Sequence, residues 1–281
     1  MLSNLKKEVR LFNDNFDVKL TDTPNLLFLD HIEEDVEVKA STTEINGTDG
    51  VLMGPTTFGP FNLVLNFSFK GLDTKDLKLY KQKIRNILYQ REPYYVWHSD
   101  APGKKYAVYC DSNDNDDLTN SFATFEVTFV VWKGYSESYL KTDEMSLSNH
   151  HDWQFGNGYL AFDETDDFHH RTKKFRIYNG SSDAIDPTLR HVLNITVHAN
   201  APNGFKIRSL TTGDEFEYTG SLVYTDTFML KGVYPVKNGS RVGADTNMSW
   251  LTLEKGFNYF VVEGEGLSDF DITFSFNFIY R

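Results

Sequence analysis

From residue 158 to its last residue, the chain alternates between turn signals and short segments rich in aromatic and β-branched residues. Such side chains are enriched in β-strands, and pairs such as Asn179-Gly180 and Asn203-Gly204 favour tight turns. The segments are residues 158–162, 174–178, 190–198, 205–209, 215–218, 227–230, 234–237, 249–253, 259–263 and 271–280. Many short strands at this spacing, with no helical pattern between them, predict an antiparallel β-sandwich.

The first half of the chain predicts a second β-rich domain. Apolar and polar side chains alternate over residues 61–69, which is the period of a strand with one buried face. Residues 93–138 predict a long β-hairpin, because aromatic flanks surround a Pro- and Gly-containing turn at 100–104. Turn residues also predict a loop at 54–60 and an acidic loop at 111–117.

One helix is predicted, over residues 74–91. Its apolar side chains recur at helical spacing, Asp73 or Thr74 caps its start, and Pro93 ends it. The helix is basic within an acidic protein. Two interpretations of its cations remain open: a solvated polar face opposite the core, or a docking surface for an acidic patch on a neighbouring subunit.

The boundary between the two halves is expected in a polar, unpatterned stretch at residues 136–157. The prediction is an N-terminal domain of residues 1–140 and a C-terminal domain of residues 141–281.

Charge and composition exclude several classes of function. The formal net charge is −12, which argues against a general or sequence-specific nucleic-acid binder. No stretch has the apolar length of a membrane span, and the N-terminus has no apolar core of signal-peptide length, so membrane insertion is not expected. Cys110 is the single cysteine and is expected to be a small buried apolar residue.

No motif predicts catalysis, a cofactor or a metal site. The chain lacks a phosphate-binding glycine loop and a Gly-x-Ser-x-Gly elbow. The histidine doublets at 150–151 and 169–170 are expected to be polar loop residues near the domain junction. The acidic segment from Asp111 has no glycine at its sixth position and has Phe122 at its twelfth, which rejects an EF-hand. We therefore expect a protein that is not an enzyme.

Two tryptophans of the second half, Trp153 and Trp250, suggest a different role. An exposed aromatic ring on a β-sandwich can stack on a sugar, whereas most tryptophans pack in a core or an interface. The alternative function is therefore a carbohydrate-binding module or an adhesin involved in attachment to a host cell wall.

The order of features along nearly the whole chain resembles the distal tail proteins of long, non-contractile-tailed phages. In the first half the resemblance rests on the predicted strand, helix and hairpin in that order, on Asn46-Gly47-x-Asp49-Gly50, on Pro102-Gly103-Lys104-x-Tyr106 and on residues 125–129. In the second half it rests on the segments at residues 212–220, 226–228 and 255–262 and on the terminal aromatic strand. The pair Thr48-Asp49 departs from the family, which has a basic residue between the glycines.

The resemblance implies a mainly β, structural protein. Its N-terminal domain would be a ring-forming, tail-tube-like, β-sandwich-like domain with one α-helix and a long β-hairpin. Its C-terminal domain would be a galectin-like antiparallel β-sandwich that projects outward. Six copies would form a ring that connects the tail tube to the tail-tip hub or baseplate and to the receptor-binding apparatus. An acidic lumen would keep passing DNA from binding.

The implied partners are five further copies of the chain, the tail tube protein, the tape-measure and tail-tip hub proteins, and receptor-binding or baseplate proteins. The implied location is the virion, at the phage tail tip, after synthesis in the host cytoplasm. A closed ring needs a heterologous interface. We hypothesise that the basic helix and the hairpin provide part of it, through Lys78, Lys81, Arg85, Tyr94, Lys104 and Lys105.

Overall fold

A computed structural model describes residues 7–117, 119, 121–145, 154, 156–158 and 168–281. The chain forms two compact units, Met1–Glu137 together with Arg281, and Ser138–Tyr280. We call them the N-terminal and the C-terminal domain. The predicted mainly β fold is confirmed in both, and among the described residues the only α-helix lies in the N-terminal domain.

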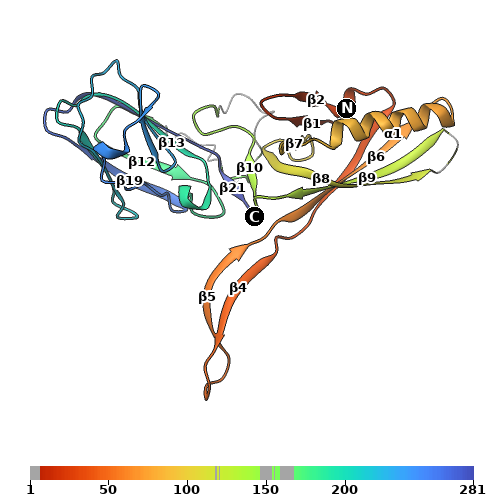
Figure 1. Cartoon of the computed structure of the whole chain (residues 1–281), viewed down its shortest axis with the longest axis horizontal. Coiled ribbons are helices and arrows are strands. Elements are labelled where there is room, and N and C mark those ends of the chain that lie inside the picture. The colour runs from red at the N-terminus through yellow and green to blue at the C-terminus, as the bar shows by residue number, and fades with distance from the viewer. Residues whose placement is uncertain (1–6, 118, 120, 146–153, 155, 159–167) are drawn as a thin grey trace. The chain divides into compact units, whose positions relative to one another are not determined.

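The N-terminal domain is built on one antiparallel sheet in the order β2-β1-β7-β8-β9-β6-β3 (Figure 1). The strands are β1 (Val9–Phe12), β2 (Asp17–Lys19), β3 (Leu26–Glu33), β6 (Phe61–Lys70), β7 (Tyr94–His98), β8 (Lys104–Asp117) and β9 (Phe122–Val131). A short 3-10 helix, Leu20–Asp22, follows β2, and β10 (Ser136–Ser138) follows β9. The alternating strand predicted at residues 61–69 is β6, which buries the phenylalanines at 61, 67 and 69.

The helix α1 (Thr74–Leu88) packs its apolar stripe against one face of this sheet (Figure 1). Asp73 caps it, because its carboxylate accepts hydrogen bonds from the backbone N–H groups of Lys75 and Asp76. The Tyr80 ring stacks on Phe69 with ring centroids 3.5 Å apart. The helix ends three residues before the predicted Arg91.

The predicted hairpin is present, but its acidic loop is not a loop. Backbone hydrogen bonds close the predicted turn, from Ala101 to His98 and from Lys104 to Ala101. Beyond it, β8 continues to Asp117 and pairs with β9 from Val108 to Asp117, with Asp114 opposite Glu126. The segment was predicted as a loop because its polar sequence has no hydrophobic alternation, and the side chains of Asp111 and Asp114 are exposed.

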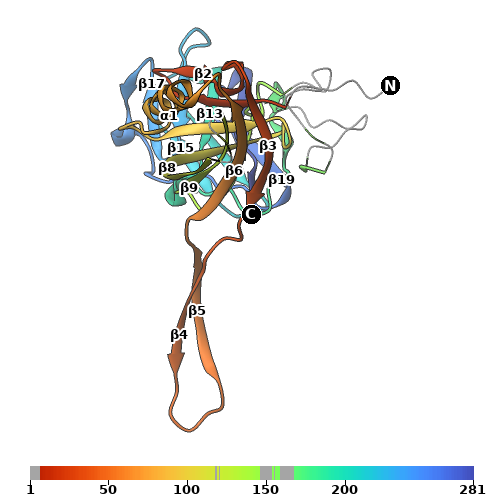
Figure 2. The ribbon, with the colours of Figure 1, turned by 90° about the vertical axis from the view of Figure 1, so that its right-hand side faces the viewer.

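A two-stranded arm extends from the sheet (Figures 1 and 2). It consists of β4 (Val38–Glu44) and β5 (Val51–Phe58), joined by the turn at residues 45–50. Gly47 and Gly50 adopt positive φ there, which fits the Asn-Gly and Asp-Gly pairs of the sequence. The predicted loop at residues 54–60 is therefore wrong over residues 54–58, where Pro55 is tolerated because β5 has a free edge.

The C-terminal domain consists of two antiparallel sheets, in the orders β11-β20-β13-β16-β17-β18 and β12-β19-β14-β15. Their strands are β11 (His169–His170), β12 (Lys174–Asn179), β13 (Leu193–Asn200), β14 (Phe205–Ser209), β15 (Glu215–Tyr218), β16 (Phe228–Lys231), β17 (Tyr234–Lys237), β18 (Ser240–Arg241), β19 (Gly256–Glu263) and β20 (Ser268–Phe276). A further short strand, β21 (Ile279–Tyr280), lies outside these two sheets. Short 3-10 helices lie at Pro187–Leu189 and Gly243–Asp245.

Aromatic contacts between the sheets make the core of this sandwich. Phe260 of β19 lies 5.1 Å from Phe274 of β20, and Phe216 of β15 lies 5.9 Å from Phe228 of β16, between ring centroids. Two predicted strands differ. Residues 249–253 form no strand, and the segment 271–280 is interrupted at Asn277, whose buried amide donates to the carbonyls of Ser138 and Leu140. Most of the predicted strand at 158–162 lies outside the described residues.

Candidate assembly surfaces

The basic face of α1 is available to a partner. Lys78 and Arg85 are exposed and Lys81 is half-buried, while the opposite stripe of the helix is buried against the sheet. Because that stripe anchors the helix, the exposed cations Lys78 and Arg85 contribute little to the fold of the single chain and can attract an acidic surface.

Tyr94 was predicted at an interface between subunits, and the structure corrects this. The residue is 2% exposed. Its hydroxyl donates a hydrogen bond of 2.7 Å to the Leu88 carbonyl at the end of α1, and its ring meets Phe129 edge-on. Burial raises the pKa of this phenol above its ordinary value. Tyr94 therefore holds the helix on the sheet and does not face a partner.

The two turn lysines are partly engaged within the chain. The Lys104 ammonium lies 3.7 Å from the Glu33 carboxylate, and the Lys105 ammonium lies 5.1 Å from the centre of the Tyr95 ring. Lys133 approaches the same ring at 5.4 Å. The Tyr95 ring thus lies near two ammonium groups, those of Lys105 and Lys133. The two turn lysines, Lys104 and Lys105, are half-buried.

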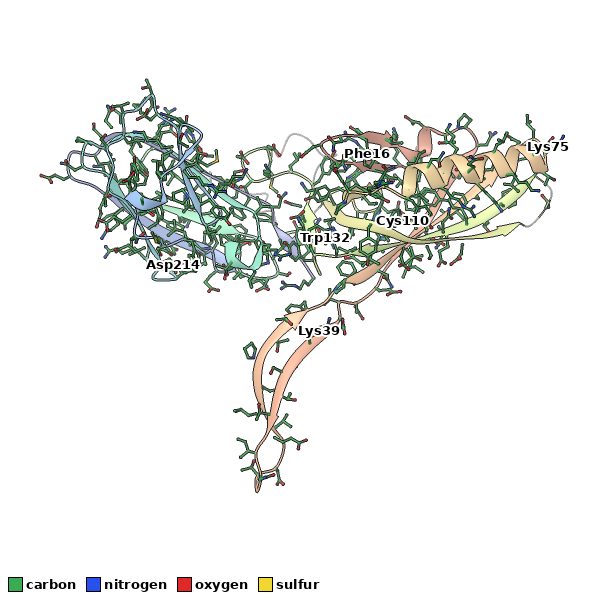
Figure 3. All side chains as sticks on the ribbon, in the orientation of Figure 1. Phe16, Lys39, Lys75, Cys110, Trp132 and Asp214 are labelled. Atoms are coloured by element: carbon green, nitrogen blue, oxygen red, sulfur yellow. The ribbon has the colours of Figure 1, made fainter. Side chains whose placement is uncertain are left out.

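The sequence did not indicate the most exposed surface of the domain, which is the arm. Every residue of β4 and β5 is exposed, including the apolar side chains Val38, Val51, Leu52, Met53 and Phe58. Figure 3 shows the side chains of the arm, of which Lys39 is labelled, with no second layer of chain over them. The paired turn signals at 46–50 could have revealed a hairpin, but not its length.

A row of polar side chains crosses the sheet on the face opposite α1. Asp30 of β3, Asn66 of β6, Glu126 of β9 and Asp114 of β8 are neighbours across these strands. The Asn66 amide donates a hydrogen bond of 2.6 Å to Asp30. Glu126 follows Phe125, which lies near Tyr80 of α1, so alternation along β9 places the carboxylate on the other face. This acidic row carries three carboxylates.

A buried histidine lies at the end of β7. His98 is fully buried between His31, Phe28 and Tyr106, and its ring centroid lies 4.2 Å from that of His31. Among the described residues, none forms a hydrogen bond with either ring nitrogen. Burial, followed by the neighbouring His31, lowers the pKa of His98 to about 3. The imidazole is therefore neutral at physiological pH.

The remaining predicted residues are placed as follows. Cys110 packs against the core, and burial raises the pKa of its thiol to about 11. Trp250 is 40% exposed, whereas Trp153 lies outside the described residues. Within the described ranges, there is no group of three or more His, Cys, Asp or Glu side chains that could hold a metal ion. No α-helix in that part of the chain has the length and apolar character to cross a membrane.

Comparisons with known proteins show which family and which solved structures this chain is similar to. Residues 15–131 match the family described as phage tail protein RIFT-related domain. No curated protein matches the sequence. The Dit protein of phage SPP1, described as a paradigm of the hub adsorption apparatus in phages that infect Gram-positive bacteria, has a similar fold with a TM-score of 0.69. The two share 13% identity over 96% of this chain and 99% of that protein.

A chain in the activated baseplate of phage P2 with calcium is also similar, at 10% identity and a TM-score of 0.46, over 96% of this chain and 97% of that one. The predicted resemblance to phage tail proteins is confirmed by the family match and by the shared fold with SPP1 Dit. Residues 15–131, which make up most of the N-terminal domain, are thus similar to the phage tail protein RIFT-related domain family.

Proposed function

We propose that this protein is a structural component of a phage tail tip, in which six copies form a ring between the tail tube and the hub or baseplate. The match to a phage tail family and the fold shared with SPP1 Dit support a tail role. The proposed partners are the tail tube, tape-measure, tail-tip hub and receptor-binding or baseplate proteins. The proposed location is the tail tip of the virion, after synthesis in the host cytoplasm.

The observation that carries the proposal is the unsupported arm. An isolated two-stranded hairpin is at best marginally stable in water, and exposed apolar side chains gathered on one element mark an interaction surface. Leu52 and Met53 are 61% and 60% exposed in the single chain. In a ring, the arm of each copy would lie on the next copy, which is the heterologous contact that a closed ring requires.

The acidic row supports the same arrangement. On our proposal, the face of the sheet that carries Asp30, Glu126 and Asp114 lines the ring. Carboxylates on an inner wall repel the phosphates of DNA. The domain roles also remain proposals: residues 1–140 as the ring-forming part, and residues 141–281 as an outward-facing β-sandwich that holds other tail proteins.

Charge reversal on α1 tests whether this helix takes part in the ring. In the triple variant Lys78→Glu, Lys81→Glu, Arg85→Glu, we expect association between copies to weaken about tenfold at low salt and less at high salt. The expected cause is the loss of attraction to an acidic patch on the neighbouring copy. The measurement is mass by light scattering across a dilution series, with circular dichroism to show that the fold is kept.

The matched control reverses the same amount of charge on the C-terminal domain, through the exposed residues Arg190, Lys231 and Lys255. This control should associate like the unmodified protein. Equal association of the two triple variants would show that α1 is a solvated face and is not an interface.

A further inference from the structure

A cleft in the C-terminal domain gathers an aromatic ring and hydrogen-bonding groups, and Trp250 is not among the residues that line it. Its volume is about 570 Å³, and it is lined by Arg171, Tyr224, Asp269 and Phe270. Ligand pockets of proteins have volumes of this order. The lining combines an aromatic ring, an exposed guanidinium and a carboxylate, all from one domain of one chain.

The backbone is shaped to form this cleft. The pairing of β13 with β20 is interrupted between His198 and Asn200, and β20 carries an extra residue there. Asp269, within that bulge, adopts a φ of +46°, which is unusual for a residue other than glycine. Bulges re-aim side chains, and strained backbone of this kind clusters at functional sites. Here the result is that the Asp269 carboxylate accepts a hydrogen bond of 2.6 Å from the Asn200 amide.

Further hydrogen bonds fix the polar groups around the cleft. The Asn200 side-chain oxygen accepts from the Tyr224 backbone N–H at 2.9 Å. His198 Nδ1 lies 2.9 Å from the Asp226 carbonyl, which can only accept, so Nδ1 carries the proton. Nε2 of a neutral His198 is then a hydrogen-bond acceptor. Asp271 is held between His169 and Arg171, at 2.7 Å and 3.4 Å.

These groups keep hydrogen-bonding capacity for a ligand. Asn200 retains one amide hydrogen, Asp269 retains its second oxygen, and Arg171 has a side chain that is 75% exposed. Tyr224 is 44% exposed, and the centre of its ring lies 6.2 Å from that of His198. Donors and acceptors held in place beside an aromatic face match the alternating hydroxyl groups and the apolar face of a sugar ring.

The charges of the cleft select among ligands. Among the described residues that line the cleft, Arg171 is the one cation, and Asp269 and Asp271 offset its charge, so these residues do not present the excess positive charge that a phosphate group requires. We propose that this cleft binds a neutral saccharide, with Tyr224 as the stacking platform and with Asn200, Asp269 and Arg171 as the groups that bind its hydroxyls. The proposal does not depend on ring formation, because one chain supplies every group.

Saturation-transfer difference NMR on the full chain tests the proposal. The probes are the methyl glycosides of glucose, galactose, N-acetylglucosamine and rhamnose at about 10 mM, because few contacts imply affinities near ~1 mM. Glycerol 1-phosphate is the anionic probe. We expect signal from at least one glycoside, at least about tenfold weaker binding in Tyr224→Ala and in Asn200→Ala, and no signal from glycerol 1-phosphate.

Two variants serve as matched controls. Tyr234→Ala removes an exposed tyrosine of β17, and Trp250→Ala removes one of the two platforms suggested by the sequence. Both should bind like the unmodified protein. The proposal is overturned if no glycoside gives signal, if Tyr224→Ala and Asn200→Ala bind normally, if Trp250→Ala alone abolishes binding, or if glycerol 1-phosphate binds in place of the sugars.

Discussion

A chain whose arm is replaced by a tight turn should fold and yet fail to form rings. Gly59 N–H donates a hydrogen bond of 2.7 Å to the Glu37 carbonyl, so the two ends of the arm lie side by side and an Asn-Gly turn can join them. Since every residue of β4 and β5 is exposed, the deletion should change the unfolding free energy by less than about 1 kcal/mol. The measurements are mass by light scattering and thermal unfolding.

A double variant tests whether the apolar side chains of the arm, and not only its backbone, are needed for association. Leu52→Glu with Met53→Glu should weaken association about 100-fold, since burying two such side chains contributes about 3 kcal/mol. The control places the same charges at Leu210 and Met248, two exposed apolar residues of the C-terminal domain, and should leave association unchanged. Rings of normal stability from the arm-deleted chain would contradict the role that we give to the arm.

Acid should destabilise the N-terminal domain through His98. The folded chain binds a proton on this imidazole only near pH 3, whereas the unfolded chain binds it near the ordinary value of 6.5. Between these values the unfolded state holds more protons, so the unfolding free energy falls as the pH drops through this window. The loss should reach about 3 kcal/mol at pH 4. The groups around the ring are His31, Asp100, Lys104 and Lys7.

Urea unfolding at pH 7 and at pH 4 measures this loss. In a background of Trp153→Phe and Trp250→Phe, fluorescence reports on the N-terminal domain through Trp97 and Trp132. His98→Leu and His98→Phe should flatten the pH dependence, because an apolar ring or chain in this pocket takes up no proton. His169→Gln, at a half-exposed histidine of the C-terminal domain, should retain it. An equally steep fall in both His98 variants would assign the acid sensitivity to other groups.

The sequence was most informative where one face of an element is buried and turn residues mark its ends. This condition holds for β6, for α1 and for most strands of the sandwich, and their predicted positions agree with the structure within a few residues. It fails for the arm, because both faces of β4 and β5 are exposed, so the alternation of Val38 and Ala40 with polar neighbours does not mark a buried face. The acidic end of β8 was predicted as a loop because its polar sequence has no hydrophobic alternation.

Site residues were harder to predict than elements. Tyr94 and Tyr95 are adjacent in a strand and point to opposite faces, and sequence alone does not show which of them enters the core. The cleft at Tyr224 depends on a bulge that brings Asp269 next to Asn200, residues far apart in the chain. No sequence pattern predicted the burial of His98, because residues of β3 and β8, distant in the chain, pack around it.

The mass of the unmodified protein in solution, by light scattering, tests the central claim most directly. The protein would be measured alone over a range of concentrations and then mixed with its tail tube and tail-tip hub proteins. A ring of six copies predicts a species of six times the mass of one chain, alone or when the partners are added. The mass of a single chain under all of these conditions would contradict the assignment.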